Sequence, residues 1–219
     1  MNKKVFGNDL SLRSFLLAAV LLGGCATPVD KSEITPKLYS NADKNIALAV
    51  IEARPYVVTG NKTPKFEGIV RGGFGIPLAV DRPGRPAEER FVDYLAGMIK
   101  DGMEQAGAKV TVLAVPVNAS LEDTLAKMAP TGASRYVVLR VLESNWDLGG
   151  LSGMLSYKYD FSLFVAGPGG FQTQGKNLTA NEANKASDKY NVFDMHSVRY
   201  REILETMFAD PAIRGALAN

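Results

Sequence analysis

Apolar and polar residues alternate, or recur at helical spacing, over most of the chain beyond residue 44. The clearest strand is residues 155–166 (LSYKYDFSLFVA), where aromatic and aliphatic side chains alternate with polar ones. That pattern is typical of an antiparallel strand with one buried face and one solvated face. Further strands are predicted over residues 45–53, 109–115, 134–147 and 171–180.

Two long helices are predicted from apolar residues that recur every three or four positions. They cover residues 87–106 and 191–208. Ser120 is expected to cap a shorter helix that runs to residue 128, and a terminal helix is expected after Pro211. This order of elements favours a single α+β domain. We expect a mixed, largely antiparallel sheet of about five strands, with the two long helices on one face.

Residues 56–86 are rich in Gly and Pro and show no sustained period. Apart from a short strand near residues 68–71 or 77–80, this segment is predicted to be a long loop, which in a compact domain is usually either functional or disordered. Arg71 and Phe74, near its centre, are candidate partner-binding residues. They would supply a charge-assisted contact and apolar area. The alternative is that Phe74 fills the domain's own core while Arg71 is solvated.

Trp146 is a third candidate for a partner-binding surface. Strict alternation in its strand places it with Tyr136 and Arg140, on the face opposite to Val137 and Val141. Tyrosine and tryptophan on such a face are typical of interface anchors. They could equally pack beneath the long loop.

No motif in the chain indicates catalysis. The Gly72-Gly-Phe-Gly75 stretch lacks the third glycine of a dinucleotide fingerprint, and no helix is predicted to start there, so a turn is favoured. His196 lies beside Asp194 and Ser197, but adjacent residues point to different faces of a helix. We therefore expect a solvated or hydrogen-bonded surface histidine, no catalytic residues and no cofactor.

The first 25 residues have the anatomy of a secretory signal. Lys3, Lys4 and Arg13 precede a short apolar run, FLLAAVLL, which ends in Leu22-Gly-Gly-Cys25. Eight residues of helix span about 12 Å, which is too short to cross a bilayer. We therefore predict that residues 1–24 are a cleaved signal peptide.

The Leu22-Gly-Gly-Cys25 sequence resembles the lipobox of bacterial lipoproteins. The resemblance implies cleavage between Gly24 and Cys25 and attachment of palmitate-type acyl chains to Cys25. Two or three such chains anchor a protein stably in a membrane. Because Ala26, rather than Asp, follows the cysteine, the resemblance also implies transfer to the periplasmic face of the outer membrane.

Residues 25–44 are predicted to be a lipidated tether, and residues 45–219 the periplasmic domain. Residues 26–44 contain two Pro and many polar residues without a period, so they are expected to be coil spanning on the order of 25 Å.

Composition and charge exclude some kinds of site and give no support for some kinds of partner. The chain is 46% hydrophobic and 22% charged, as in ordinary globular proteins. Its single Cys and single His exclude a disulfide framework and a metal site built from several histidines of one chain. Without residues 1–24 the chain has equal numbers of basic and acidic residues, which gives no electrostatic case for nucleic-acid binding.

The order of elements also resembles small bacterial envelope lipoproteins of the YajG type. The Gln105-Ala-Gly-Ala-Lys-Val110 turn, the long aromatic hairpin and the final Asp210-Pro-Ala-Ile-Arg214 segment carry this resemblance, which covers most of residues 45–214. It implies a compartment rather than an activity.

We therefore predict a non-catalytic, lipid-anchored periplasmic protein that binds or assembles with another component of the cell envelope. An accessory subunit of an envelope transport or secretion machine is one alternative. A hydrolase acting on cell-wall or lipid material is another. The partner and the oligomeric state stay open.

Overall fold

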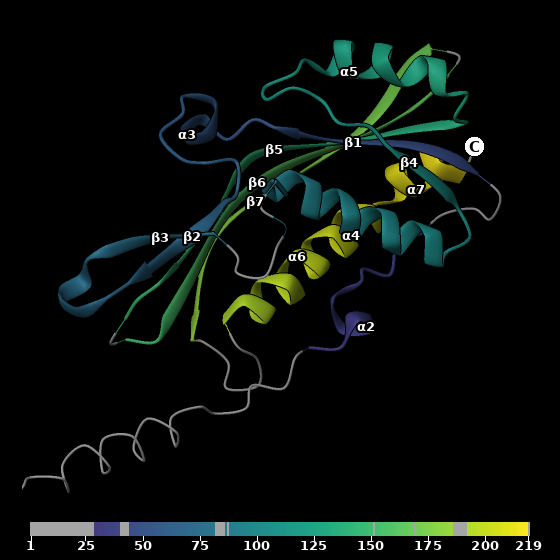
Figure 1. Cartoon of the computed structure of the whole chain (residues 1–219). Coiled ribbons are helices and arrows are strands. Elements are labelled where there is room, and N and C mark those ends of the chain that lie inside the picture. Colours follow the sequence, from purple (N-terminus) through teal and green to yellow (C-terminus); the bar gives the residue numbers. More distant parts are fainter. Residues whose placement is uncertain are drawn as a thin grey trace, which may run out of the picture.

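Seven strands form one mixed sheet in the computed structural model, which describes residues 29–39, 44–81, 86, 88–150, 152–168, 170–185 and 192–218 (Figure 1). The strands are β1 (Asn45–Glu52), β2 (Phe66–Arg71), β3 (Pro77–Asp81), β4 (Lys109–Val112), β5 (Arg135–Leu148), β6 (Met154–Gly167) and β7 (Gly170–Lys185). The predicted α+β class is confirmed, but the sheet is larger than the expected five strands. The additional strands β2 and β3 lie in the segment predicted to be a loop with one short strand near residues 68–71 or 77–80, and strands form at both places. The sheet is also mixed rather than largely antiparallel, because β1 pairs in parallel with β4 and β5, and β2 pairs in parallel with β5.

The long strand β5 organises the sheet. One of its edges pairs with β6 in antiparallel fashion, and β6 pairs in turn with β7. The other edge is shared by two parallel strands, β1 along residues 135–141 and β2 along residues 146–148. Strand β4 extends the sheet beyond β1, and β3 extends it beyond β2. Because β1 and β2 meet β5 one after the other, the β2–β3 hairpin lies at the far end of β5 from β4 (Figure 1).

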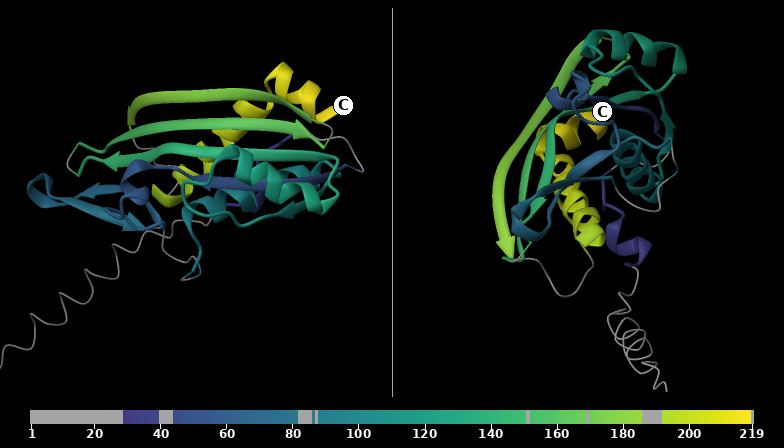
Figure 2. Two further views of the ribbon diagram at one scale, coloured as in Figure 1. Left: turned by 90° about the horizontal axis from the view of Figure 1, so that it is seen from above. Right: turned by 60° about the vertical axis from the view of Figure 1, so that its left-hand side comes forward.

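Helices cover both faces of the sheet. Helices α4 (Phe91–Gln105), α6 (Val192–Phe208) and α7 (Pro211–Ala218) share the larger core with one face of the sheet. Helix α5 (Leu121–Met128) lies on the opposite face, over a smaller core that includes Ala47, Ala49 and Val138. Both long helices thus lie on one face, as predicted, and Ser120 caps α5 by accepting a hydrogen bond from the Asp123 amide. Figure 2 shows α5 apart from the two long helices.

Part of the segment predicted to be a tether packs against the larger core. Residues Lys31–Ile34 form a short helix, α2, and Leu38 is buried with the side chains of the larger core. The amide of Lys37 donates to the Glu205 carboxylate at 2.9 Å, and the Arg201 guanidinium donates to the Glu33 carbonyl at 3.0 Å. The expectation of coil throughout residues 26–44 is therefore wrong for Lys31–Ile34, and residues 37 and 38 contact the domain instead of lying in the tether. The cause is a tertiary contact that a local period cannot reveal.

A bulge between Val141 and Glu143 changes which side chains of β5 face the core. Before the bulge Val137, Leu139 and Val141 face the larger core, and after it Trp146 does so. Strict alternation, which placed Trp146 on the opposite face, fails because one extra residue reverses the two faces.

Candidate functional site

The β2–β3 hairpin occupies residues 66–81 of the segment 56–86, where a long loop with at most one short strand was expected. Its strands pair directly from Gly68 opposite Val80 to Arg71 opposite Pro77, and the Gly72 amide donates to the Ile76 carbonyl at 2.9 Å. Strand β2 also pairs with β5, with Gly68 opposite Trp146. A Cβ at Gly68 would lie 2.2 Å from the indole ring, so only glycine lets the two strands approach this closely.

Phe74 occupies the turn of the hairpin, and its side chain is fully exposed. Its backbone lies in the left-handed region, with φ 61° and ψ 16°. A bulky residue in this region is a genuine outlier, and such strain is concentrated at functional sites. The alternative in which Phe74 fills the core is therefore wrong, and the turn presents the ring to solvent.

Further apolar side chains continue from Phe74 along β3. Ile76 is 59% exposed and Leu78 is 56% exposed, whereas Val80 packs partly against the larger core. Exposure thus rises towards the turn, because the hairpin extends past the helices that cover the rest of this face (Figure 1).

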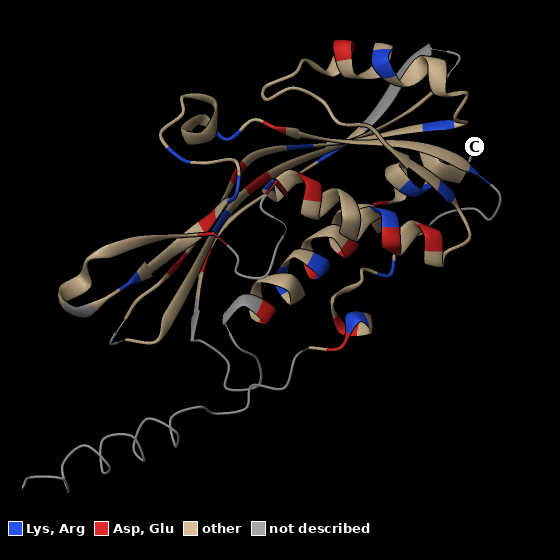
Figure 3. Cartoon of the chain, viewed as in Figure 1, with Lys and Arg blue, Asp and Glu red and all other residues tan. Residues whose placement is uncertain are grey.

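The turn between β5 and β6 lies against the end of β2, next to the turn of the hairpin. A Cβ at Gly150 would lie 2.3 Å from the Arg71 carbonyl oxygen, so the two backbones are in close contact. Met154, just after this turn, is 41% exposed, but its neighbour Leu155 faces the larger core, so alternation places Met154 on the other face of the sheet from Leu78. We call Phe74, Ile76 and Leu78 the hairpin patch. Figure 3 shows that little charge interrupts the hairpin near its end.

Arg71 forms the charged margin of this hairpin. Its Nε donates to both carboxylate oxygens of Asp147, at 2.9 and 3.0 Å, and its terminal nitrogen also contacts that carboxylate. The hydrogen bond and charge of Asp147 raise the pKa of Arg71 above its usual value. The guanidinium that was predicted to meet a partner's anion is therefore already paired within the chain.

Trp146 does not belong to an exposed surface. It is 1% exposed and stacks on His196, with ring centroids 4.0 Å apart and an interplanar angle of 18°. His196 is itself buried, and its Nδ1 lies 2.9 Å from the Tyr157 hydroxyl. Both the predicted binding role of Trp146 and the predicted surface position of His196 are wrong. Together the two rings join α6 to the sheet.

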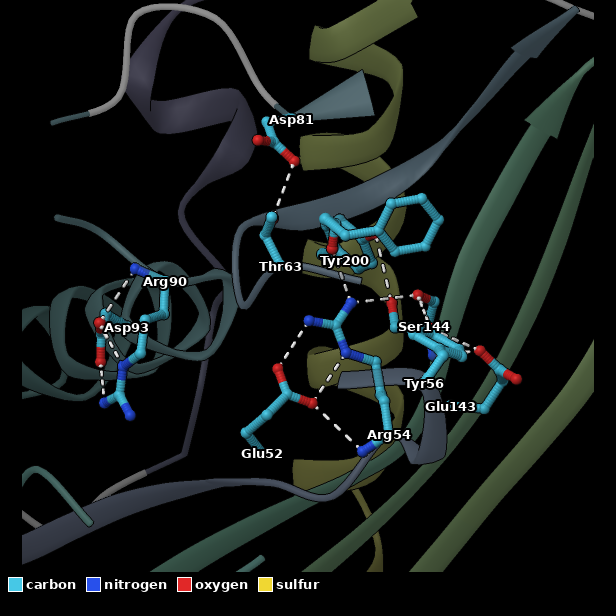
Figure 4. Close-up of polar contacts among 11 residues, drawn as sticks. Glu52, Arg54, Tyr56, Thr63, Asp81, Arg90, Asp93, Glu143, Ser144 and Tyr200 are labelled. Atoms are coloured by element: carbon cyan, nitrogen blue, oxygen red, sulfur yellow. Dashed lines mark hydrogen bonds and ion pairs between the residues drawn. The ribbon is translucent and has the colours of Figure 1, made fainter. Parts of the chain in front are cut away.

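A buried ion pair fills the gap between β1 and β2 along the edge of β5. The Arg54 guanidinium donates to Glu52 through Nε at 2.8 Å and through a terminal nitrogen at 2.6 Å, and both side chains are fully buried. Arg54 also donates to the carbonyls of Phe66 and Ser144, at 2.7 and 3.4 Å. Figure 4 shows Arg54 at the centre of these contacts.

The ring of Tyr56 completes the same gap. Its hydroxyl, as a hydrogen-bond donor, lies 2.8 Å from the Ser144 carbonyl oxygen and 2.7 Å from the Glu143 carboxylate. Burial raises the pKa of Tyr56. Burial lowers the pKa of Arg54, but the hydrogen bond and charge of Glu52 outweigh it, so that pKa is raised. These groups replace the hydrogen bonds of a missing strand, which is a structural role. The sequence analysis missed Glu52, Arg54 and Tyr56. The signal that could have found the ion pair is that Glu52 and Arg54 are two positions apart at the end of an apolar strand.

A small pocket lies where the N-terminal segment meets the end of α6. It has a volume of about 230 Å³ and is lined by Lys37, Tyr39, Glu205, Phe208, Ala209 and Arg214. The Arg214 guanidinium lies over the Tyr39 ring, 5.8 Å from its centroid. The pocket is small, and the charges around it have both signs.

Neither a membrane-spanning helix nor a metal-binding cluster is found in the described part of the chain. Its helices are too short or too polar to cross a bilayer. Its His, Cys, Asp and Glu side chains form no group of three that could hold an ion. Residues Gly24 and Cys25, the predicted cleavage and acylation sites, lie outside the described residues.

Comparisons with known proteins leave the function open. No family model and no curated protein sequence matches the chain. An uncharacterised protein of known structure aligns with a TM-score of 0.41 and 9% identity, over 81% of this chain and 97% of that one. A hypothetical protein from Chlamydia trachomatis aligns with a TM-score of 0.35 and 14% identity, over 77% and 99% of the two chains.

A third solved structure is described as a homologue of a neuraminyllactose-binding hemagglutinin from Helicobacter pylori. It aligns with a TM-score of 0.34 and 7% identity, over 87% of this chain and 95% of that one. Overlaps this weak assign neither a family nor a function, and the resemblance to YajG-type lipoproteins stays a prediction.

Proposed function

We propose that this protein is a lipid-anchored, non-catalytic binding or assembly protein of the bacterial cell envelope, and that the hairpin patch contacts a protein partner. The observation that carries the proposal is the fully exposed Phe74, held outward by a strained turn. An aromatic anchor with aliphatic neighbours is the usual centre of a protein interface.

The N-terminal sequence supports the anchor and its placement. Leu22-Gly-Gly-Cys25 matches the lipobox pattern, and acylation of Cys25 would attach the chain to the periplasmic face of the outer membrane. Because α2 begins at Lys31 and packs on the domain, only residues 26–30 separate it from Cys25. Five residues reach at most about 17 Å, so the domain would be held close to the bilayer.

The charges around the hairpin patch favour a protein over the lipid surface as its partner. Attraction to anionic headgroups needs unpaired lysine or arginine side chains. Here Arg71 is paired with Asp147. Such a pair beside an apolar centre matches the polar rim of a protein interface.

Photo-crosslinking in intact envelopes tests this contact. A benzophenone amino acid at position 74 should give one discrete protein adduct, and the same group at Val112 should not. Val112 is a matched control because it is a 43% exposed apolar residue on β4, at the other end of the sheet. Leu78→Ser should weaken the adduct at position 74. Adducts to lipid alone, or equal adducts at both positions, would refute the proposed contact.

The anchor is tested separately. Cys25→Ser should abolish incorporation of labelled palmitate and release the protein from membranes or block its processing. A wild-type protein that stays membrane-bound without any acyl group would end the lipoprotein hypothesis, while leaving the hairpin contact open to its own test.

A further inference from the structure

We propose that β7 pairs with β7 of a second copy of this chain, so that two sheets join into one continuous sheet across a twofold axis. This inference does not depend on acylation or on the hairpin patch. It concerns the opposite side of the sheet from β3 and β4.

The starting observation is the length of the edge strand β7. It runs for 16 residues, and within the described part of the chain it pairs with β6 alone. Figure 2 shows it as the outermost strand in both views. An unpaired strand edge is a template for another strand, and proteins usually keep such edges short or protected.

The other two edges of this sheet follow that rule. Strand β3 has five residues and begins with Pro77, and strand β4 has four and begins with Lys109. In contrast, β7 contains no proline, and its pairing shows no irregularity between residues 174 and 185. The longest edge thus has lysines at positions 176 and 185 but neither a proline nor a bulge between residues 174 and 185, which is expected if another strand covers it.

The side chains of β7 favour a second copy as that strand. In an antiparallel pair related by a twofold axis through Thr179, residues equally distant from Thr179 lie opposite one another. Lys176 then lies opposite Glu182 of the other copy, and the same pair recurs on the other side of the axis. Within one chain Lys176 pairs with Asp210 at 3.2 Å and Glu182 pairs with Arg199, so the pairing across the axis would extend these ion pairs. Shifting the axis to residue 178 or 180 separates these opposite charges. Directly opposite charges stabilise a strand pair, so the sequence selects this register.

The remaining pairs in this register are also compatible. On the exposed face, Thr179 lies opposite itself, and Asn177 lies opposite Asn181. These side chains are small or can hydrogen-bond across the strands. On the inner face, half-buried Leu178 lies opposite half-buried Ala180, so pairing would remove more apolar surface from water.

Cysteine scanning of the full chain in mild detergent tests both the pairing and its register. Thr179→Cys places two thiols directly opposite, within the Cα separation that a disulfide requires. Asn177→Cys is the matched control, because the two introduced thiols would be about 13 Å apart along the strands. We expect Thr179→Cys to give at least about tenfold more disulfide dimer than Asn177→Cys. Cys25 is present in every variant, and mass spectrometry of the linked peptide separates its contribution.

Mixing two different cysteine variants provides a second test of the register. Asn177→Cys and Asn181→Cys should each crosslink poorly alone and efficiently when combined. Thr179→Lys places two cations opposite one another at an exposed position, so it should convert the dimer to monomer in sedimentation without changing the circular dichroism. Equal crosslinking at positions 177 and 179, a monomer at tens of micromolar, or a dimer that survives Thr179→Lys would each overturn the proposal.

Discussion

Removing Arg54 tests the view that a buried ion pair takes the place of a missing strand. Arg54→Met keeps much of the side-chain volume but leaves the Glu52 carboxylate fully buried without its partner. It also removes the donors to the carbonyls of Phe66 and Ser144, and the contact of the guanidinium with the Phe91 ring, whose centroid lies 4.6 Å away.

The expected loss is large because a charge is left buried. Breaking a buried ion pair on one side costs about 3–5 kcal/mol of unfolding free energy. For a domain of this size that corresponds to a decrease in melting temperature of roughly 6–20 °C. The double variant Glu52→Leu with Arg54→Met removes both charges and should recover stability to within about 1–3 kcal/mol of wild type, which is the cost of a carbonyl left without a donor.

Urea denaturation of wild type, both single variants and the double variant measures this coupling. Lys100→Met serves as a control for charge loss at an exposed pair, where the Lys100–Glu104 distance is 3.9 Å. We expect that change to cost less than about 0.5 kcal/mol. If Arg54→Met is equally mild, or if the double variant is less stable than both single variants, the ion pair does not hold the gap between β1 and β2.

Four further outcomes follow from the structure. Phe74→Ala should leave the melting temperature within about 2 °C of wild type, because the ring touches little of the domain; a large decrease would show a structural role. Gly68→Ala should cost about 1–3 kcal/mol, because its Cβ would collide with the indole ring beneath the hairpin, and proteolysis should then cut the hairpin sooner; unchanged protection would contradict the close approach. Leu38→Ala should destabilise the domain by about 2–5 kcal/mol, as measured by chemical denaturation; no loss would mean that the N-terminal segment is not part of the core. Burial raises the pKa of Asp93, but hydrogen bonds from the guanidinium and the backbone amide of Arg90 outweigh the effect of burial, so the pKa of Asp93 lies below the ordinary 3.8. Its contribution to stability is therefore present above pH 3.8 and is lost as the pH falls below that value, and Asp93→Asn should flatten this part of the stability–pH profile.

Local pattern was sufficient for most elements of the domain. The alternation in residues 155–166 corresponds to β6, and the apolar spacing in residues 191–208 corresponds to α6. Ser120 caps α5 as predicted, because capping depends on residues only three positions apart. In each case the neighbours that decide the conformation lie close in sequence.

The hairpin was predicted only in part: one short strand was expected near residues 68–71 or 77–80, and both segments form strands that pair. Residues 66–71 form a strand because Gly68 allows the backbone to approach Trp146, which is far away in the chain. The sequence did indicate Phe74 as a candidate, but solvent exposure of its ring depends on how far the hairpin extends past the helices. Ile76 and Leu78 were missed as exposed apolar residues for the same reason, although a short strand near residues 77–80 was one of the two predicted.

The sequence by itself determined the element types, the α+β class and the prediction of a lipid anchor, because these depend on short-range periodicity and on one contiguous motif. The tertiary structure decided which face of the sheet each side chain occupies and which strands lie at the edges of the sheet. The bulge after Val141 turned Trp146 into the core, and packing against α6 drew Leu38 out of the expected tether. The order of strands left β7 at the edge of the sheet. Burial and strand order depend on contacts between residues distant in sequence, which no local period encodes.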